Sequence, residues 1–178
     1  MKQDPPIEHD IYITLEQILT GITKKVKITR SIMDPFTGQQ TEERKALEIP
    51  IPAGIYTGWS YSFPREGDQR PQAIPADINF TVHQKVHNHF IRYGANVKYN
   101  ALLSEKEAND GQFVLQIPTL DGDTIPYETE DGIDKPKVFP GKGLPLEDNP
   151  NERGDMIVHF KVGDCYLGMF YFLSINQI

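Results

Sequence analysis

The sequence FPREGDQRPQAIPADINFTV, residues 63–82, predicts the fold because its pattern is repeated later in the chain. The second copy is FPGKGLPLEDNPNERGDMIVHFKV, residues 139–162. Both copies open with Phe-Pro, place a glycine four residues after the phenylalanine, and pass through a polar loop that contains proline. Each copy then has an aspartate, Asp77 or Asp155, followed by a run in which apolar residues alternate with polar ones. Alternation with a period of two is typical of a half-buried strand. A loop and a strand repeated in the same order predict a duplicated domain.

Composition narrows the class of protein. A length of 178 residues suits one domain or two small ones, and the repeat favours two. The net charge of -7 argues against a general nucleic-acid binder, because neutralising phosphates takes surplus Lys and Arg. The single cysteine, Cys165, excludes a disulfide framework and indicates a reducing compartment. The sequence shows no secretion signal and no apolar run long enough to cross a bilayer, so we expect a cytoplasmic or nuclear protein.

Short alternating segments predict antiparallel β-structure with very little helix. The expected elements are strands at 9–14, 24–30, 47–51, 56–63, 97–103 and 113–117, helical turns at 15–21 and 105–111, and tight turns at 34–38 and 119–123. The second helical turn has few apolar residues, so we expect it to be frayed. Residues 83–94 are expected to be the junction between the halves.

The expected fold is therefore all-β, with two tandem small β-sandwich-like domains that each contain a short helical turn. The predicted boundaries are an extended leader at 1–8, a first domain at 9–86, a second domain at 87–162 and an atypical tail at 163–178.

Catalytic and metal-binding motifs give little support for an enzyme. The sequence has no GxSxG, no HExxH and no phosphate loop. His83, His87 and His89 lack a recognisable third zinc ligand, so a solvated junction between domains is favoured over a metal site. Asp121 and Asp123 resemble the start of a calcium loop whose closing acidic ligand is missing, so a hairpin turn is favoured. We expect a non-enzymatic protein without a cofactor.

A binding function is therefore favoured, and the predicted strands at 9–14 and 24–30 are the best candidates for the binding site. Their apolar positions are Ile11, Ile13, Val26 and Ile28. One interpretation places all four in the core. In the other, one face of the strands lines a groove beside an open strand edge, to which an extended peptide adds.

A cationic strip lies on the second of these strands, within an acidic protein. It consists of Lys24, Lys25, Lys27 and Arg30. Such a strip is usually a solvated face, but beside an open strand edge it could hold a carboxylate.

Three stretches carry a resemblance to a known family. They are DPPIEHDIYITLEQILTGITKKVKITR at 4–30, GWSYSFPREGDQRPQAIPADINFTV at 58–82, and TLDG followed by PGKGLP at 119–122 and 140–145. In this order they resemble the C-terminal substrate-binding region of class B DnaJ-type J-domain cochaperones. The resemblance implies two β-sandwich-like C-terminal domains, the first with a shallow groove for unfolded polypeptide. It also implies that the first domain binds the acidic C-terminal tail of a DnaK-type heat-shock chaperone.

The resemblance assigns residues to both roles. The family's groove positions fall on Ile11, Ile13, Val26, Ile28 and Phe80. Its tail contacts fall on Lys24 and Lys27, with Lys25 and Arg30 beside them. The alternative function is a structural adaptor of the same fold in a stable assembly such as a ciliary radial spoke, which would make the localisation axonemal.

The sequence also departs from the family. The J-domain with its His-Pro-Asp motif, the Gly/Phe-rich linker and the Cys-rich insertion of class A members are not in it. A fragment, an aberrant gene product and a J-less paralogue all remain open. Where the family's homodimers continue into a dimerising helix, this chain has CYLGMFYFLSINQI at 165–178. Its aromatic residues favour a strand, which we expect to pack on the second domain rather than to pair two chains.

Overall fold

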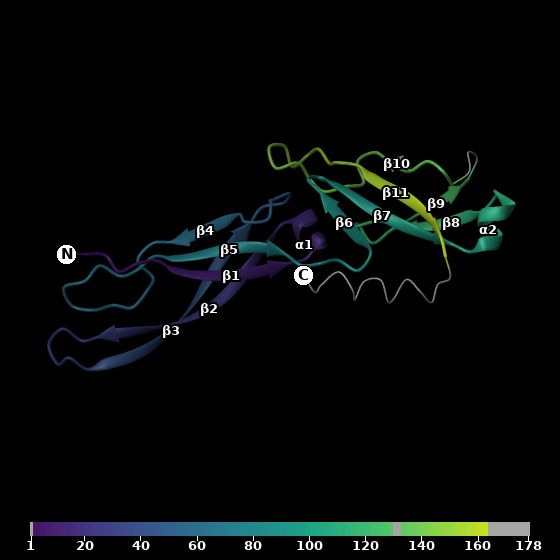
Figure 1. The fold of residues 1–178 in the computed structure, drawn as a ribbon. Coiled ribbons are helices and arrows are strands. Elements are labelled where there is room, and N and C mark those ends of the chain that lie inside the picture. The colour runs from purple at the N-terminus through teal and green to yellow at the C-terminus, as the bar shows by residue number, and fades with distance from the viewer. Residues whose placement is uncertain (1, 130–132, 164–178) are drawn as a thin grey trace. The chain divides into compact units, whose positions relative to one another are not determined.

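A computed structural model describes residues 2–129 and 133–163, which divide into two compact units between Lys85 and Val86 (Figure 1). Strands dominate both units, and each contains one short helix within the described ranges. The predicted class, all-β with two tandem domains and a helical turn in each, is confirmed. The strand predicted for 165–178 lies outside the described residues.

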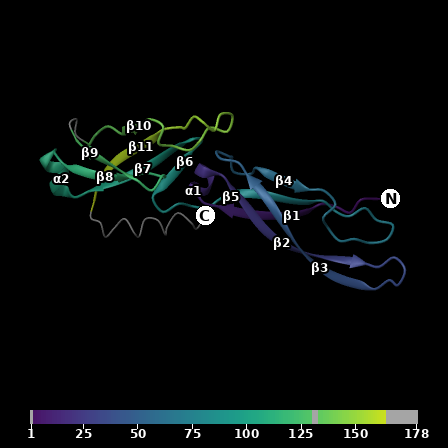
Figure 2. The same ribbon diagram turned by 180° about the vertical axis from the view of Figure 1, so that it is seen from behind.

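Unit 1, the first of these, comprises two sheets within residues 2–85. Its elements are β1 (Ile7–Ile13), α1 (Leu15–Thr20), β2 (Ile22–Met33), β3 (Gln40–Ile51), β4 (Ser60–Phe63) and β5 (Ile78–Gln84). One sheet has the order β1-β5-β4, with β1 and β5 parallel, and the other is the antiparallel β2–β3 hairpin. In both ribbon views the hairpin diverges from β1 toward its tip (Figures 1 and 2).

Helix α1 is short because its two ends are fixed locally. Thr14 and Gln17 form a capping box, in which the Gln17 main-chain N–H donates to Thr14 Oγ1 and the Thr14 N–H donates to Gln17 Oε1. Gly21 ends the helix with a φ of 70°, and a Cβ there would lie 2.9 Å from the Ala53 nitrogen. Leu15 and Ile18 are buried, so the helix closes the core at the end of β1.

Unit 2 repeats this plan and adds one strand. Its elements are β6 (Phe90–Tyr93), β7 (Asn96–Leu103), α2 (Glu105–Asp110), β8 (Val114–Pro118), β9 (Thr124–Glu128), β10 (Lys137–Phe139) and β11 (Met156–Val162). One sheet has the order β10-β11-β7-β6, and β8 and β9 form a hairpin. The predicted turn at 119–123 joins that hairpin, with the Thr119 N–H donating to the Asp123 carbonyl oxygen over 2.9 Å.

Two local expectations for unit 2 need correction. Helix α2 has no buried residue, yet it is as long as α1, because a capping box between Ser104 and Glu107 and a left-handed Gly111 fix its ends. The expected junction at 83–94 contains a strand, β6, which pairs with β7 across a tight turn at Gly94. Its residues do not alternate cleanly, so the pattern did not reveal it.

The two units share one register, which confirms the repeat. Strand β1 pairs with β5 from Ile7 opposite Ile78, and β7 pairs with β11 from Val97 opposite Met156. Counted back from the helix caps Thr14 and Ser104, Ile7 and Val97 occupy the same position. Strand β7 is therefore the counterpart of β1, and β11 is the counterpart of β5.

The repeated aspartates hold the repeated loops. Asp77 Oδ1 accepts the Arg65 main-chain N–H over 2.9 Å, and Asp155 Oδ1 accepts the Gly141 N–H over 3.1 Å. Both donors have left-handed backbones, with φ of 58° and 69°. In each copy the start of the loop is thus tied to the residue just before the strand that follows it.

The repeated glycine permits close packing of backbones. The repeated glycine is Gly67 in the first copy and Gly143 in the second. The Gly67 N–H donates to the Ala76 carbonyl, and the Gly143 N–H donates to the Gly154 carbonyl. A Cβ on Gly67 would lie 3.0 Å from the Cβ of Ala76, and one on Gly143 would clash with the Ala95 carbonyl oxygen. Neither glycine has a positive φ, so the close approach of another backbone is the reason for glycine at this position.

No helix within the described ranges is long and apolar enough to cross a membrane.

Candidate functional site

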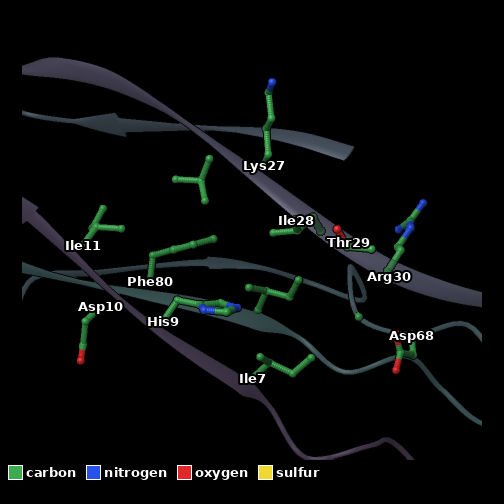
Figure 3. Close-up of a pocket in the computed structure, with 13 residues that line it drawn as sticks. Ile7, His9, Asp10, Ile11, Lys27, Ile28, Thr29, Arg30, Asp68 and Phe80 are labelled. Atoms are coloured by element: carbon green, nitrogen blue, oxygen red, sulfur yellow. The ribbon is translucent and has the colours of Figure 1, made fainter. Parts of the chain in front are cut away.

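A groove of about 430 Å³ opens in unit 1 between β1 and β2, with β5 beneath it (Figure 3). It is lined by Ile7, His9, Asp10, Ile11, Val26, Lys27, Ile28, Thr29, Arg30, Gly67, Asp68, Ile78 and Phe80. These residues come from both sheets and from the first copy of the repeated loop. The groove therefore exists only because the two sheets of the unit pack together.

The floor of the groove is apolar and firmly packed. Ile11 and Ile28 are each 7% exposed, and Phe80 is 1% exposed. The His9 ring stacks on the Phe80 ring with 5.4 Å between centroids. The Phe63 ring packs edge-on against Phe80, with 5.9 Å between centroids. Because these side chains hold one another in place, the floor presents a fixed apolar surface to a ligand.

Within the described residues, strand β1 is an edge strand of its sheet, and its unpaired edge borders this groove. The Ile7 N–H donates to the Asp77 carbonyl over 2.8 Å, and the Ile13 carbonyl accepts the Lys85 N–H over 2.7 Å. Main-chain groups alternate in direction along a strand, so odd-numbered residues of β1 bond to β5 and even-numbered ones point away. The even-numbered residues are Glu8, Asp10 and Tyr12.

Strand β2 also turns an open edge to the groove. The Ser31 carbonyl accepts the Gln69 N–H over 2.8 Å, and the Met33 N–H donates to the Gln69 carbonyl over 2.9 Å. Odd-numbered residues of β2 therefore face away from β3. Pro50, which has no N–H to donate, lies opposite Thr23, as this alternation requires. Before Ser31 no described segment pairs with this edge, so Lys25, Lys27 and Thr29 direct main-chain groups outward.

The counterpart of the open β1 edge is covered in unit 2. Strand β6 pairs antiparallel with β7, with Ile91 opposite Lys98 and the buried Phe90 opposite Tyr99. By the shared register, Lys98 corresponds to Glu8 of β1. The duplicated unit thus shows that a strand can be added along this edge, and within the described residues unit 1 leaves it unfilled.

The cations of the strip differ in how they are paired. Lys25 forms an ion pair with Glu48 over 2.9 Å, and the hydrogen bond and charge of that carboxylate raise the pKa of Lys25. Arg30 is bound by Glu43 over 2.6 Å and by Glu66 over 2.7 Å. These two cations are therefore neutralised within the unit.

Lys24 and Lys27 form no ion pair with any described residue. The Lys24 ammonium donates to the neutral Tyr12 carbonyl over 2.8 Å and so links β2 to β1. Lys27 has no ion-pair partner among the described residues, and Figure 3 shows its side chain extending away from Ile28 and Phe80. The net positive charge of the strip is therefore carried by these two lysines.

The structure brings most, but not all, of the predicted groove residues together. Ile11, Val26, Ile28 and Phe80 line the groove, whereas Ile13 is fully buried and is not part of its lining. Of the cations, Lys27 and Arg30 line it.

Sequence reasoning missed several lining residues. Ile7 and His9 belong to the same alternating series as Ile11. Ile7 lies before the predicted strand at 9–14, and His9 lies within it but was not predicted as a groove residue because it is not apolar. Asp68 comes from a loop far along the chain, and no local pattern pointed to it.

The histidines and acidic residues have local roles. His83 Nε2 lies 2.9 Å from Asp10 Oδ1, and His87 Nδ1 accepts the main-chain N–H groups of His89 and Phe90. Across residues 2–129 and 133–163, no three His, Cys, Asp or Glu side chains gather as a metal site would require.

Comparison with known proteins places this geometry in a family. The family described as DnaJ C terminal domain matches residues 7–163, which includes both units and the groove. The chain belongs to the DnaJ C-terminal domain family. The resemblance to the C-terminal region of class B DnaJ-type proteins, inferred from sequence, is thereby confirmed.

Individual proteins similar to this chain also carry DnaJ names. Human DnaJ homolog subfamily B member 5 is 47% identical over 163 residues, covering 90% of this chain and 46% of that protein. DnaJ protein homolog 1 of Drosophila melanogaster is 40% identical over 164 residues, covering 90% of this chain and 48% of that protein. Human DnaJ homolog subfamily B member 13 is 36% identical over 165 residues, covering 90% and 51%. The chain spans about half the length of these relatives.

Proposed function

We propose that unit 1 binds extended or unfolded polypeptide by strand addition in the groove, as the client-binding part of a DnaJ-type cochaperone. The observation that carries this proposal is a fixed apolar floor flanked by open strand edges. Such an edge supplies main-chain hydrogen bonds to any sequence, and the floor takes alternate side chains. The role needs no catalytic group, because the groove acts by binding alone.

The open edge of β2 is the better partner for the added strand. On β1 the Tyr12 carbonyl is already engaged by Lys24, whereas the main-chain groups of Lys25, Lys27 and Thr29 remain available. A ligand strand paired with these residues lies over Ile11, Ile28 and Phe80. Its apolar side chains then point alternately into the groove and toward solvent.

The affinity of this binding should be modest. A ligand that buries about three apolar side chains gains roughly 1.5–3 kcal/mol for each in gross transfer free energy. Ordering a flexible chain and restricting its motion cancel much of that gain. We expect a Kd in the range of about 1 μM or weaker, equivalent to about -8 kcal/mol at most. Weak binding suits a protein that must release its clients.

The same groove is suited to the acidic C-terminal tail of a DnaK-type heat-shock chaperone. Lys24 and Lys27 supply uncompensated positive charge near the first residues of β2. A tail with its terminal carboxylates at this end runs antiparallel to β2, which is the usual sense of strand addition to a hairpin. Client and tail would therefore compete for one edge.

A serine substitution in the groove tests the proposal. Val26→Ser should weaken suppression of aggregation of a denatured client about tenfold, because Val26 lines the groove without being fully buried. The matched control is Val114→Ser, the same change at a residue of unit 2 that is 61% exposed. If both variants protect the client as well as the parent chain does, the groove is not the binding site.

A further inference from the structure

The groove carries opposite charges at its two ends, which bears on the ligands it selects. Given the proposed peptide-binding function, on which this inference rests, we propose that Asp68 selects polypeptides with a basic residue at the end of the groove opposite Lys24. Asp68 would thus be a specificity-determining residue that separates basic, apolar clients from an acidic chaperone tail.

Asp68 is held at the point where the open edge of β2 ends. Its Oδ1 accepts the Ser31 main-chain N–H over 2.8 Å, and the neighbouring Gln69 bonds to Ser31 and Met33. The loop therefore continues the edge as a fixed stop. Figure 3 places the Asp68 carboxylate at one end of the row of lining side chains and Ile11 at the other.

The charges around Asp68 leave its carboxylate uncompensated. Arg30, whose side chain is only 11% exposed, is paired with Glu43 and Glu66, and Lys45 binds Glu66 over 2.8 Å. Two cations and two carboxylates thus form a closed and neutral set. Asp68 lies outside this set. Its side chain is exposed and accepts a hydrogen bond from a neutral main-chain N–H, and no cation of the described residues forms an ion pair with it.

Positive charge lies toward the other end of the groove, where Lys27 lines it and Lys24 lies just beyond its lining. Lys24 donates to a neutral carbonyl, and Lys27 has no ion pair among the residues described. Along β2, Ser31 follows Lys27 by four residues and Lys24 by seven. At about 3.3 Å per residue, the two charged ends are about 13–23 Å apart. A ligand strand that satisfies both has an acidic residue and a basic residue about four to seven positions apart.

The two ligand classes would then use different ends. An acidic tail contacts Lys24 and Lys27 and gains nothing from Asp68. A client strand with a lysine or arginine beside its apolar residues gains an ion pair with Asp68. For solvent-exposed pairs of this kind the expected change in affinity is about three- to fivefold, and it should shrink with added salt.

The test uses two labelled heptapeptides with one apolar core of alternating leucine and serine. One carries lysine at its first position, and the other carries glutamates at its last two positions. Each is titrated against the full chain by fluorescence anisotropy. Asp68→Asn removes the charge but retains an oxygen to accept the Ser31 N–H, so the loop should stay in place. Asp110→Asn, an exposed residue of unit 2, is the control for overall charge.

We expect Asp68→Asn to weaken binding of the lysine peptide about three- to fivefold and to leave the glutamate peptide unchanged. Lys27→Gln should do the reverse. Equal effects of Asp68→Asn on both peptides, or an effect matched by Asp110→Asn, would overturn the inference while leaving the groove intact as a binding site. If neither peptide binds the parent chain, the proposed function fails, and this inference fails with it.

Discussion

Replacing Thr29 by proline should weaken binding of an extended peptide while leaving the β2–β3 hairpin folded. Thr29 pairs with Arg44 but, as an odd-numbered residue of β2, directs its N–H away from β3. Proline removes that donor and sets a ring in the path of an added strand. The hairpin already accepts Pro50 at an equivalent position opposite Thr23, so the substitution leaves every bond between the two strands in place.

The expected loss follows from one main-chain hydrogen bond. A net contribution of about 0.5–1.5 kcal/mol corresponds to a two- to tenfold change in Kd, and the proline ring adds to it. We therefore expect binding about tenfold weaker for Thr29→Pro. Thr29→Ala is the matched control, because it shortens the same side chain and keeps the N–H.

The assay is a titration of the full chain with a labelled heptapeptide of alternating leucine and serine, followed by anisotropy. Circular dichroism of each variant checks that the strands are retained. A second peptide, N-methylated at alternate residues so that it cannot pair along an edge, should bind the parent chain as poorly as the first peptide binds Thr29→Pro. Equal affinity of Thr29→Pro and Thr29→Ala, with unchanged circular dichroism, would refute strand addition at β2.

Three further outcomes follow from the fold. Ile13→Ser should lower the thermal unfolding midpoint, by an amount equivalent to about 3–5 kcal/mol, because Ile13 is 0% exposed; an unchanged midpoint in a melting curve would place Ile13 outside the core. Ile91→Pro should detach β6 from β7, because Ile91 lies opposite Lys98, and should speed amide exchange at Lys98; unchanged exchange at Lys98 would argue against this pairing. Hydrogen bonds from Ser104 lower the pKa of Glu107 below its ordinary value of 4.5, so α2 should be most stable above pH 4.5 and fray as the pH falls through that lowered value. Amide exchange of α2 would show this loss, and Glu107→Gln should abolish the pH dependence.

The repeat was predictable because its signals are local. Asp77 reaches back to the turn that opens its own loop, and Asp155 does the same in the second copy. Phe-Pro, the glycine and the alternating strand all lie within a short stretch of chain. In this chain both copies build the same loop and strand, and the two units share one register.

Strand β6 marks the limit of that reasoning. Its residues, Phe90–Tyr93, contain one buried side chain and no period of two, and the strand exists because β7 lies beside it. The helix α2 marks another limit. Its few apolar residues favoured a frayed turn, whereas the capping box of Ser104 and Glu107 fixes the start of the helix.

The sequence by itself determined that β1 and β2 alternate, and hence which of their side chains share a face. It could not determine which of those side chains meet the core and which meet a ligand. Ile13 and Ile11 have the same spacing and chemistry, yet Ile13 is fully buried while Ile11 lines the groove. The period of a strand is a local property, whereas burial depends on what the rest of the chain lays over it.

The charged residues show the same contrast between what the local sequence determines and what the tertiary structure decides. The cationic strip is visible in the sequence, but its pairing is decided by tertiary structure. Arg30 is neutralised by Glu66, 36 residues away, and Asp68 reaches Ser31 across 37 residues. These contacts form only when the repeated loop docks against the edge of β2. Contacts over that separation leave no periodic trace in the chain, so only the folded structure showed which charges remain for a ligand.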